Sequence, residues 1–341
     1  MRLCVDLGQD RGTMASRPRK RLIIEKGWGM DIAQLLQRLR ADNTSGATTL
    51  VELALDILGA FASQEMALEQ HDFRTALEAL IGAVLAAQPS MAVLINLAQQ
   101  ALQACPDDLP LTTVRQQLQQ ALAAFRREVR HSTEALCQQA ITVLPPRATV
   151  LTYSNSATVI AALRYAHDRG RVRRVLLSES RPAYDGRPQA RALLEYGMEV
   201  EYSIDMALFE RLSEADVVVV GADAVFPDHL VNKLGTHALA QLAHLQGMPC
   251  FSFCAANKFL PTAATALLHI VNHPGHEVWP EAPNRLAISN CYFDTTPLTL
   301  LSGIVSDQRV YKPEALGLLL QRRELSPRLL QLASGRASSN H

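Results

Sequence analysis

In the N-terminal part of the chain, hydrophobic residues recur at the spacing of an amphipathic helix. Ile32, Leu35, Leu36 and Leu39 are three and four residues apart, so they lie along one side of a helix. The same spacing continues through the following segments, in which alanine and glutamine are abundant and glycine and proline are sparse. We therefore predict a helical domain over residues 30–144.

The pattern changes after Pro145 and Pro146, a pair that ends a helix and marks the expected domain boundary. Short runs of β-branched and aliphatic residues then alternate with helical stretches. The clearest run is Val217–Val220, which has no polar alternation and so fits a strand buried on both faces, as in a parallel sheet. We predict an α/β fold in which a Rossmann-like, doubly wound parallel sheet occupies residues 147–330.

The two ends of the chain lack these patterns. Residues 1–29 contain a basic stretch from Arg17 to Arg21, but no apolar segment of the kind that a secretory signal requires. We expect them to be a disordered or non-native extension, with Met30 as the natural start. Residues 331–341 are expected to form a frayed polar tail.

Composition excludes several classes of function. Among 341 residues, Lys and Arg number 33 and Asp and Glu also number 33, so the chain has no net charge with which to attract nucleic acid or an anionic membrane. No apolar run is long enough to span a bilayer. The six cysteines are scattered without a paired metal-binding spacing, and no glycine-rich dinucleotide fingerprint is present. We expect a cytoplasmic protein with no metal and no cofactor.

Polar residues follow the predicted strands one after another. They are Ser154, Arg181, Asp205, Asp223 and Lys258. The carboxyl ends of parallel strands share one edge of the sheet, where ligands bind in such folds. Ser154, Asn155 and Ser156 also precede a helix, whose free N–H groups favour an anion. The sequence therefore predicts a pocket for a small polar or phosphorylated molecule.

Each of these residues also has a purely structural interpretation. The cluster of Ser154, Asn155 and Ser156 is typical of a helix N-cap. Asp223 and Lys233 are able to form an internal ion pair, and Arg181 is able to pair with the nearby Glu179.

Several short motifs resemble those of one superfamily. They are Gly-Ala-Asp at 221–223, Asn-Lys-Leu-Gly-Thr at 232–236, Gly-Met-Pro-Cys-Phe-Ser-Phe at 247–253, Asn-Lys-Phe at 257–259 and Phe-Asp-Thr-Thr-Pro at 293–297. The chain resembles the alpha, beta and delta subunits of eukaryotic translation initiation factor 2B, a superfamily that includes methylthioribose-1-phosphate isomerase and ribose-1,5-bisphosphate isomerase. The resemblance covers residues 40–315 and implies a helical N-terminal domain followed by a Rossmann-like domain.

The resemblance also implies which positions would carry isomerase chemistry. In the isomerases a cysteine follows the first strand of the α/β domain, and Ser154 stands there in this chain. A serine hydroxyl has a far higher pKa than a thiol and is a poor acid or base without an activating neighbour. The isomerase aspartate corresponds to Asp228 or to His229, because this chain is one residue shorter before Asn232.

Two further segments match the phosphate-binding parts of the isomerases. Their Arg-Gly-Ala loop corresponds to Ser45, Gly46 and Ala47, and their Arg-Pro-Thr segment begins here with Gln88. Arginine forms paired, charge-assisted hydrogen bonds with phosphate, whereas serine and glutamine donate only neutral ones. Both replacements argue against a bisphosphate bound in the isomerase manner. In the alternative structural interpretation, Ser45 and Gln88 cap the helices that follow them.

The predicted site combines these positions. Candidate catalytic residues are Ser154, Asp228 and Asp223; candidate ligand-binding residues are Ser45, Gly46, Gln88, Asn155, Ser156, Arg181, Arg187, Asn232, Lys233 and Lys258.

Three functions fit the sequence. The first is a diverged member of the superfamily that binds a sugar phosphate or nucleotide without the usual isomerase cysteine. The second is an active aldose–ketose sugar-phosphate isomerase, an intramolecular oxidoreductase that uses Asp228 or Asp223. The third is a regulatory subunit of a guanine-nucleotide exchange factor in translation initiation. The resemblance also implies a homodimer or a larger assembly, for which Leu298, Leu300, Leu301 and Val305 are candidate interface residues, although packing in the core accounts for them equally well.

Overall fold

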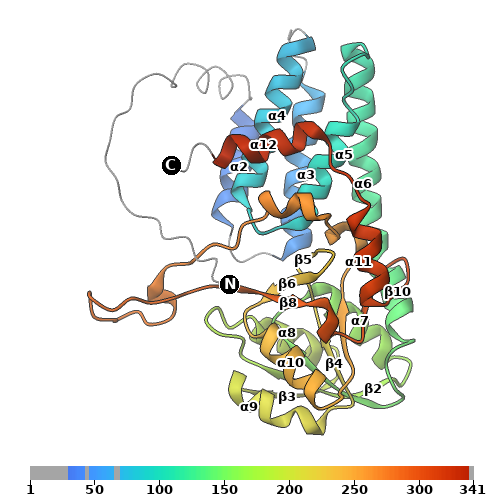
Figure 1. Cartoon of the computed structure of the whole chain (residues 1–341), viewed down its shortest axis with the longest axis vertical. Helices are drawn as coiled ribbons and strands as arrows, with labels where there is room; N and C mark the ends of the chain where they lie inside the picture. The colour runs from blue at the N-terminus through green and yellow to red at the C-terminus, as the bar shows by residue number, and fades with distance from the viewer. Residues whose placement is uncertain (1–29, 43–45, 65–69, 338–341) are drawn as a thin grey trace.

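The computed structural model describes residues 30–42, 46–64 and 70–337. The expectations for residues 1–29 and for Ser45 lie outside these ranges. The N-terminal part is helical, as the spacing of hydrophobic residues predicts (Figure 1). Its helices are α2 (Met30–Ala41), α3 (Ala47–Ser63), α4 (Gln70–Ala87), α5 (Ala92–Gln103) and α6 (Leu111–Ala140).

The second part contains the expected parallel sheet. In the described part of the chain its strands are β1 (Ala148–Tyr153), β2 (Val172–Ser178), β3 (Glu199–Ser203), β4 (Val217–Val220), β7 (Cys250–Phe253), β9 (Gly303–Val305) and β10 (Val310–Tyr311). They lie in the order β10-β9-β7-β4-β1-β2-β3, and only the pairing of β10 with β9 is antiparallel. The strand order reverses between β1 and β4, which is where open α/β sheets bind ligands.

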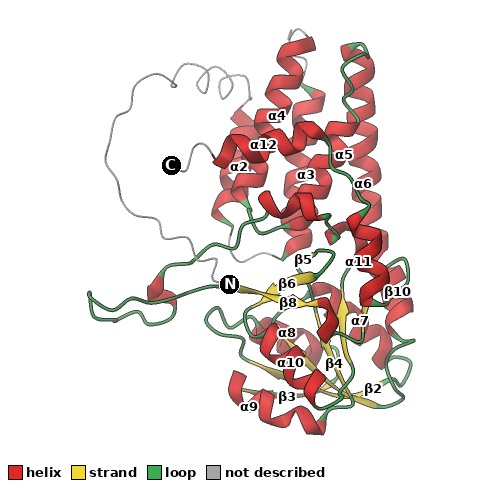
Figure 2. Cartoon of the chain, viewed as in Figure 1, coloured by secondary structure: helices red, strands yellow, loops and turns green. Residues whose placement is uncertain are grey.

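Both faces of the sheet are covered, because successive side chains of a strand point to opposite faces. Val217 and Val219 pack with α7 (Ala157–His167), α8 (Gly186–Glu195) and the end of α6. Val218 and Val220 pack on the other face with α9 (Asp205–Glu210), α10 (Thr236–Leu245) and α11 (Pro313–Gln321). Figure 2 shows helices, in red, around the strands of this part of the chain. The predicted doubly wound architecture is therefore confirmed.

A second sheet lies between β4 and the next helix, α10. Here β5 (Ala224–Val225) and β6 (His229–Lys233) form a hairpin, and β8 (Phe293–Pro297) pairs with β6. Ala224 and Val231 pack into the helical core. The small sheet thus lies between the helices and the large sheet (Figure 1).

The two parts share helices as well as this sheet. The end of α6 belongs to the core of the α/β part, although its start lies in the helical core. At the other end of the chain, α12 (Pro327–Ala337) returns to the helices, where Arg328 Nε lies 2.6 Å from Glu78 Oε1. We expected residues 331–337 to belong to a frayed tail, but they form the end of α12. The helix forms because its apolar side packs on the helical core through Leu329.

All four candidate interface residues pack in or against the core of this chain. Leu298, Leu301 and Val305 are buried within this chain, and Leu300 packs against the same core. Core packing therefore accounts for these residues within one chain.

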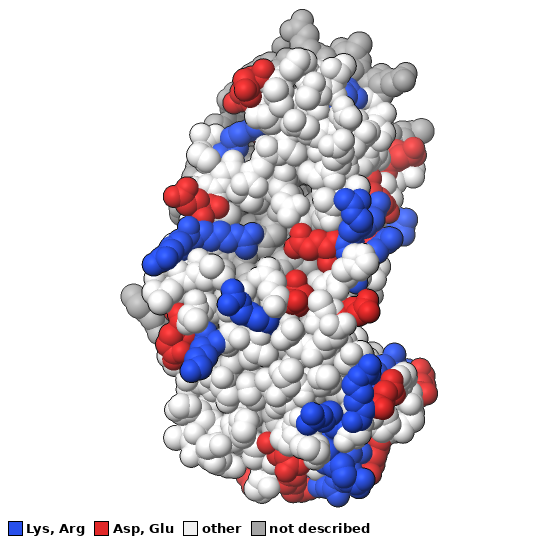
Figure 3. All heavy atoms as spheres, turned by 90° about the vertical axis from the view of Figure 1, so that its right-hand side faces the viewer, with Lys and Arg blue, Asp and Glu red and all other residues white. Residues whose placement is uncertain are grey.

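Charges of both signs are interspersed on the face shown in Figure 3, with uncharged surface between them. Among the described residues, no helix is long and apolar enough to cross a membrane.

Candidate functional site

The loops at the carboxyl edge of the sheet contain unusual backbone. Ser154, Ser180 and Tyr184 have φ angles of 69°, 55° and 58°, in the left-handed region that residues other than glycine rarely adopt. Ser154 N donates to Ser180 Oγ at 2.9 Å, which joins the loop after β1 to the loop after β2. Strained backbone of this kind gathers at functional sites, and here it gathers at the predicted edge.

Asp205 fixes the loop that follows β2. Its carboxylate accepts from Ser178 Oγ at 2.7 Å, from Ser180 N at 2.8 Å and from Arg181 N at 2.9 Å. All of these bonds hold protein groups, so Asp205 positions the edge.

The start of α7, the end of β4 and β6 converge at Gly221. Ser156 caps α7, because its Oγ accepts from Val159 N at 3.3 Å. A Cβ atom on Gly221 would lie 3.0 Å from Ser156 Oγ and 3.7 Å from Asn232 Oδ1. Glycine is therefore needed for this close approach, and it brings Ser156 and Asn232 together. Asn155 is exposed beside them.

Lys233 is the most buried cation of this edge. Its Nζ lies 2.6 Å from Asp185 Oδ2, and the side chains of Lys233 and Asp185 are 4% and 34% exposed. The ammonium also lies 4.5 Å from the centre of the Tyr292 ring, within the range of a cation–π contact. The Lys233 ammonium thus contacts a carboxylate and an aromatic ring of the same chain.

A segment before β8 covers Lys233. Tyr292 stacks on His273 with the ring centres 3.6 Å apart, and its hydroxyl donates to Glu277 Oε2. Asn290 Nδ2 donates to the same carboxylate oxygen at 2.8 Å. Burial, and then the neighbouring Glu277 carboxylate, raise the pKa of Tyr292, so its ring stays a neutral cover.

A second pair of charges adjoins the first. Asp223 follows β4, and Lys258 Nζ donates to Ala222 O at 2.7 Å. Burial raises the pKa of the Asp223 carboxyl, the negative charge of Asp185 raises it further, and Lys258 and Lys233 oppose the shift. The edge therefore combines two carboxylates with two ammonium groups.

Asp228 and His229 lie apart from this cluster. Asp228 lies in the turn between β5 and β6, and His229 begins β6. The Asp228 side chain is 84% exposed, and its Oδ1 lies 2.7 Å from His229 Nδ1. Lys233 is at the opposite end of β6, about 13 Å along the strand at the usual rise per residue. The structure thus does not bring Asp228 to Ser154 or Lys233.

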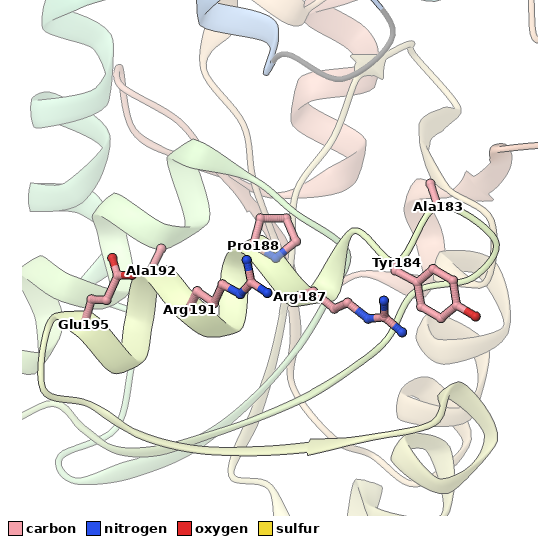
Figure 4. A pocket seen from close by; sticks show the side chains of 7 residues that line it. All are labelled: Ala183, Tyr184, Arg187, Pro188, Arg191, Ala192 and Glu195. Carbon is pink, nitrogen blue, oxygen red and sulfur yellow. The ribbon is translucent and has the colours of Figure 1, made fainter.

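The two predicted arginines are directed to an aromatic neighbour. Arg181 donates to Tyr184 OH and, at 2.9 Å, to Val278 O. The Arg187 guanidinium lies 3.7 Å from the centre of the Tyr184 ring and is exposed on α8. Arg187 lines a surface cavity of about 490 Å³ along the outer side of α8 (Figure 4). Lys233 is not among the residues that line this cavity. Another cavity, of about 570 Å³, lies between α2 and α3.

Gln88 has a structural role that differs from the expected cap of the following helix. Its Nε2 donates to Leu39 O at 2.7 Å and to Asp42 O at 2.9 Å, at the end of α2. Met91 is the N-cap residue of α5 and Gly46 that of α3, and neither makes a side-chain cap. Gln88 instead caps the C-terminal end of α2, because carbonyls at a helix end lack partners.

We expect Gln88→Ala to lower the free energy of unfolding by about 1–3 kcal/mol, because two part-buried carbonyls would lose their donors. Urea unfolding measures the change. Gln119→Ala is the matched control, since Gln119 donates only at 3.3 Å to the exposed Ser63 Oγ, and we expect it to change the value by less than about 0.5 kcal/mol. Equal effects of the two substitutions would contradict this role for Gln88.

A thiol lies near the charged cluster but is unsuited to acid–base work. Cys254 follows β7, and Lys258 and Asp223 both influence its ionisation. Burial raises the pKa of this thiol to about 12, and its Sγ donates to Ala255 O at 3.5 Å. Cys254 therefore stays a neutral thiol near neutral pH.

Iodoacetamide at pH 9 is expected to leave Cys250 and Cys254 unmodified in the folded protein. Burial raises both thiol pKa values to about 12. The reactive thiolate then makes up about one part in a thousand at pH 9. Peptide mass spectrometry checks this, with labelling in urea as the positive control. Native labelling as fast as that in urea would show that the strand is not buried.

Among the described residues, no group of three or more His, Cys, Asp or Glu side chains is arranged to hold a metal ion.

Sequence reasoning missed Asp185 and Tyr292. Asp185 lies between Arg181 and Gly186, in a segment that we had selected, but its partner is 48 positions away. Tyr292 comes directly before the Phe-Asp-Thr-Thr-Pro motif at 293–297, outside the residues that the motif selects. An aspartate before a helix is usually its N-cap residue. The sequence alone therefore does not show that the Asp185 carboxylate contacts Lys233 and leaves its helix uncapped.

Comparisons with known proteins agree with this fold. The sequence model of the Initiation factor 2 subunit family matches residues 43–313. An eIF-2B subunit 2-like protein of Pyrococcus horikoshii is 28% identical over 285 residues, which cover 83% of this chain and 96% of that protein. A ribose 1,5-bisphosphate isomerase of Methanocaldococcus jannaschii is 24% identical over 295 residues, or 85% and 94% of the two chains. The crystal structure of the Pyrococcus horikoshii translation initiation factor eIF-2B superposes with a TM-score of 0.71 at 26% identity, covering 83% of this chain and 98% of that one.

Proposed function

The chain belongs to the Initiation factor 2 subunit family, and from that premise we propose that it binds a small phosphorylated ligand, a sugar phosphate or a nucleotide, at the carboxyl edge of its parallel sheet. Family membership confirms the resemblance drawn from the motifs. In this proposal the protein is a ligand-responsive or assembly protein and does not isomerise the ligand.

The observation that carries the proposal is the burial of Lys233 at the point where the strand order reverses. A desolvated ammonium is costly unless it has a partner, and here one carboxylate and one aromatic ring supply the contacts. The start of α7 lies beside the same strands and offers free N–H groups to an anion. A ligand phosphate at this edge would interact with both.

Binding without isomerisation is supported by the lack of an acid–base pair. Aldose–ketose conversion requires groups that move a proton between neighbouring carbons. Ser154 carries a hydroxyl, whose pKa is far above that of a thiol, Asp228 lies at the far end of β6, and the Cys254 thiol is buried. Asp223, the remaining candidate, adjoins Lys233, but position 154 offers it a serine and not a thiol as partner.

Calorimetric titration with ribose 5-phosphate, AMP and ribose 1,5-bisphosphate tests binding, and a product assay with ribose 1,5-bisphosphate and methylthioribose 1-phosphate tests turnover. We expect binding of at least one monophosphate and no product from either sugar. Absence of binding by all three compounds would overturn the proposed site. Turnover that is lost in Asp228→Asn would overturn the proposal that the protein is not an isomerase.

Assembly is part of the same proposal. We propose that the protein forms a homodimer or a larger homo-oligomer, which light scattering in solution measures directly. A mass equal to one chain over the whole accessible concentration range would contradict it.

A further inference from the structure

Asp185 stands at a helix N-cap position without acting as a cap. It precedes α8, and its side chain makes no hydrogen bond to the free N–H groups of that helix. Aspartate at such a position normally stabilises the helix through this bond. Here the carboxylate lies 2.6 Å from Lys233 Nζ. The side chain therefore contacts Lys233 at the edge of the sheet and does not cap its own helix.

The order in which a ligand meets these two groups follows from their exposure. The Asp185 side chain is about one-third exposed, whereas Lys233 is almost fully covered. An incoming ligand thus reaches the carboxylate first. A carboxylate only accepts hydrogen bonds, so it favours sugar hydroxyls and repels phosphate.

The local charge balance leads to the same result. Lys233 and Lys258 supply two positive charges and Asp185 one negative charge, and burial raises the pKa of the fourth group, the Asp223 carboxyl. The cluster therefore carries at most one net positive charge, whichever form Asp223 takes. Arg181 is already bonded to Tyr184 and Val278. Such a site can neutralise one phosphate with help from the start of α7, but it lacks the cations for a second.

The helical domain does not supply the missing charge at Gln88. Both protons of its amide are donated to backbone carbonyls, of Leu39 and Asp42. Nothing on this side chain is left to donate to a phosphate.

We propose that Asp185 determines specificity because its carboxylate offsets the positive charge of Lys233. The edge of the sheet then accepts a sugar carrying a single phosphate and excludes a bisphosphate. This inference rests on the proposed function. Asp185 accepts a hydrogen bond from a ligand hydroxyl, and Lys233 and the start of α7 bind the one phosphate.

The test compares ribose 5-phosphate with ribose 1,5-bisphosphate by calorimetric titration of the full chain and of Asp185→Asn. The unsubstituted protein is expected to bind the monophosphate more tightly. Asp185→Asn keeps the shape of the side chain and removes its charge, and we expect it to shift the ratio of the two dissociation constants toward the bisphosphate by about tenfold or more. Asp185→Ser provides a second variant with the same expected direction.

Glu195→Gln is the matched control. It removes one negative charge from the other end of α8, about 15 Å away at the rise of a helix, and we expect it to leave the ratio unchanged. Because each ratio is measured within one protein sample, a partly unfolded fraction does not alter it.

The outcomes separate this inference from the one on which it rests. Binding of ribose 5-phosphate with the same ratio in the unsubstituted protein and both Asp185 variants would overturn the specificity role alone. Tighter binding of the bisphosphate by the unsubstituted protein would do the same. Absence of binding of either compound to any variant would overturn the proposed function and this inference together.

Discussion

Gly186→Ala is expected to lower the free energy of unfolding by about 3–5 kcal/mol or to prevent folding. A Cβ atom on Gly186 would lie 1.7 Å from Ser178 O, a backbone atom of β2 that cannot turn aside as a side chain can. The start of α8 would have to move away from the sheet. Asp185 would move with it, so the contact with Lys233 is expected to be lost as well.

Urea unfolding of the purified variant measures the effect, and Gly59→Ala is the matched control. Gly59 lies within α3, and a Cβ atom there has nothing within 4 Å. Alanine in a helix interior is favoured over glycine, so we expect this control to gain about 0.5–1 kcal/mol. A Gly186→Ala protein as stable as the Gly59→Ala protein would mean that α8 does not approach β2 this closely.

The large sheet could be predicted because its signal is local. The four valines of β4 have no polar alternation, and burial on both faces is the arrangement that leaves none of them in water. The helical part was predictable for the same reason, since one stripe of residues such as Ile32 and Leu36 must be covered.

The small sheet and α12 could not be predicted, because partners distant in the sequence decide both. A strand as short as β5 carries little pattern, and it forms because β6 and β8 pair beside it. The helix α12 ends in small and polar residues that suggest a loose tail. Leu329 and the Arg328 contact with Glu78 hold it against the helical core.

The sequence located the candidate site but not the contacts within it. Strand ends identify the edge, so Ser156, Asn232 and Lys233 could be placed near it from the sequence. Which group each polar side chain contacts depends on pairs far apart along the chain, such as Lys233 with Asp185. Asp228 was selected by its position in a motif, and the motif does not show that its side chain lies exposed at a turn.

Residues outside the charged cluster of Lys233, Asp185, Lys258 and Asp223 hold it in place. Asp205 fixes the loop after β2 through three hydrogen bonds, and Gly221 lets Ser156 approach Asn232. Asn96 of α5 donates to Asn257 O at 2.6 Å, which ties the segment that bears Lys258 to the helical part. The helices therefore help to position the edge that the sheet provides.

Lys233→Met is expected to weaken binding of ribose 5-phosphate by about 100-fold or more, the loss typical of removing one partner of a buried charged contact. Methionine keeps most of the length of lysine and still packs on Tyr292. Because Asp185 is partly exposed, water is able to hydrate its carboxylate once the ammonium is gone. The fold is therefore expected to survive, with a loss of about 1–2 kcal/mol in urea unfolding.

Lys312→Met is the control for this substitution, because Lys312 is an exposed residue before α11 and the change removes the same charge from the same part of the chain. We expect its affinity for ribose 5-phosphate to stay within about twofold of the unsubstituted protein. Calorimetric titration of both variants gives the comparison. If Lys233→Met binds as tightly as Lys312→Met, the buried ammonium is only a structural partner of Asp185, and the phosphate must be bound elsewhere.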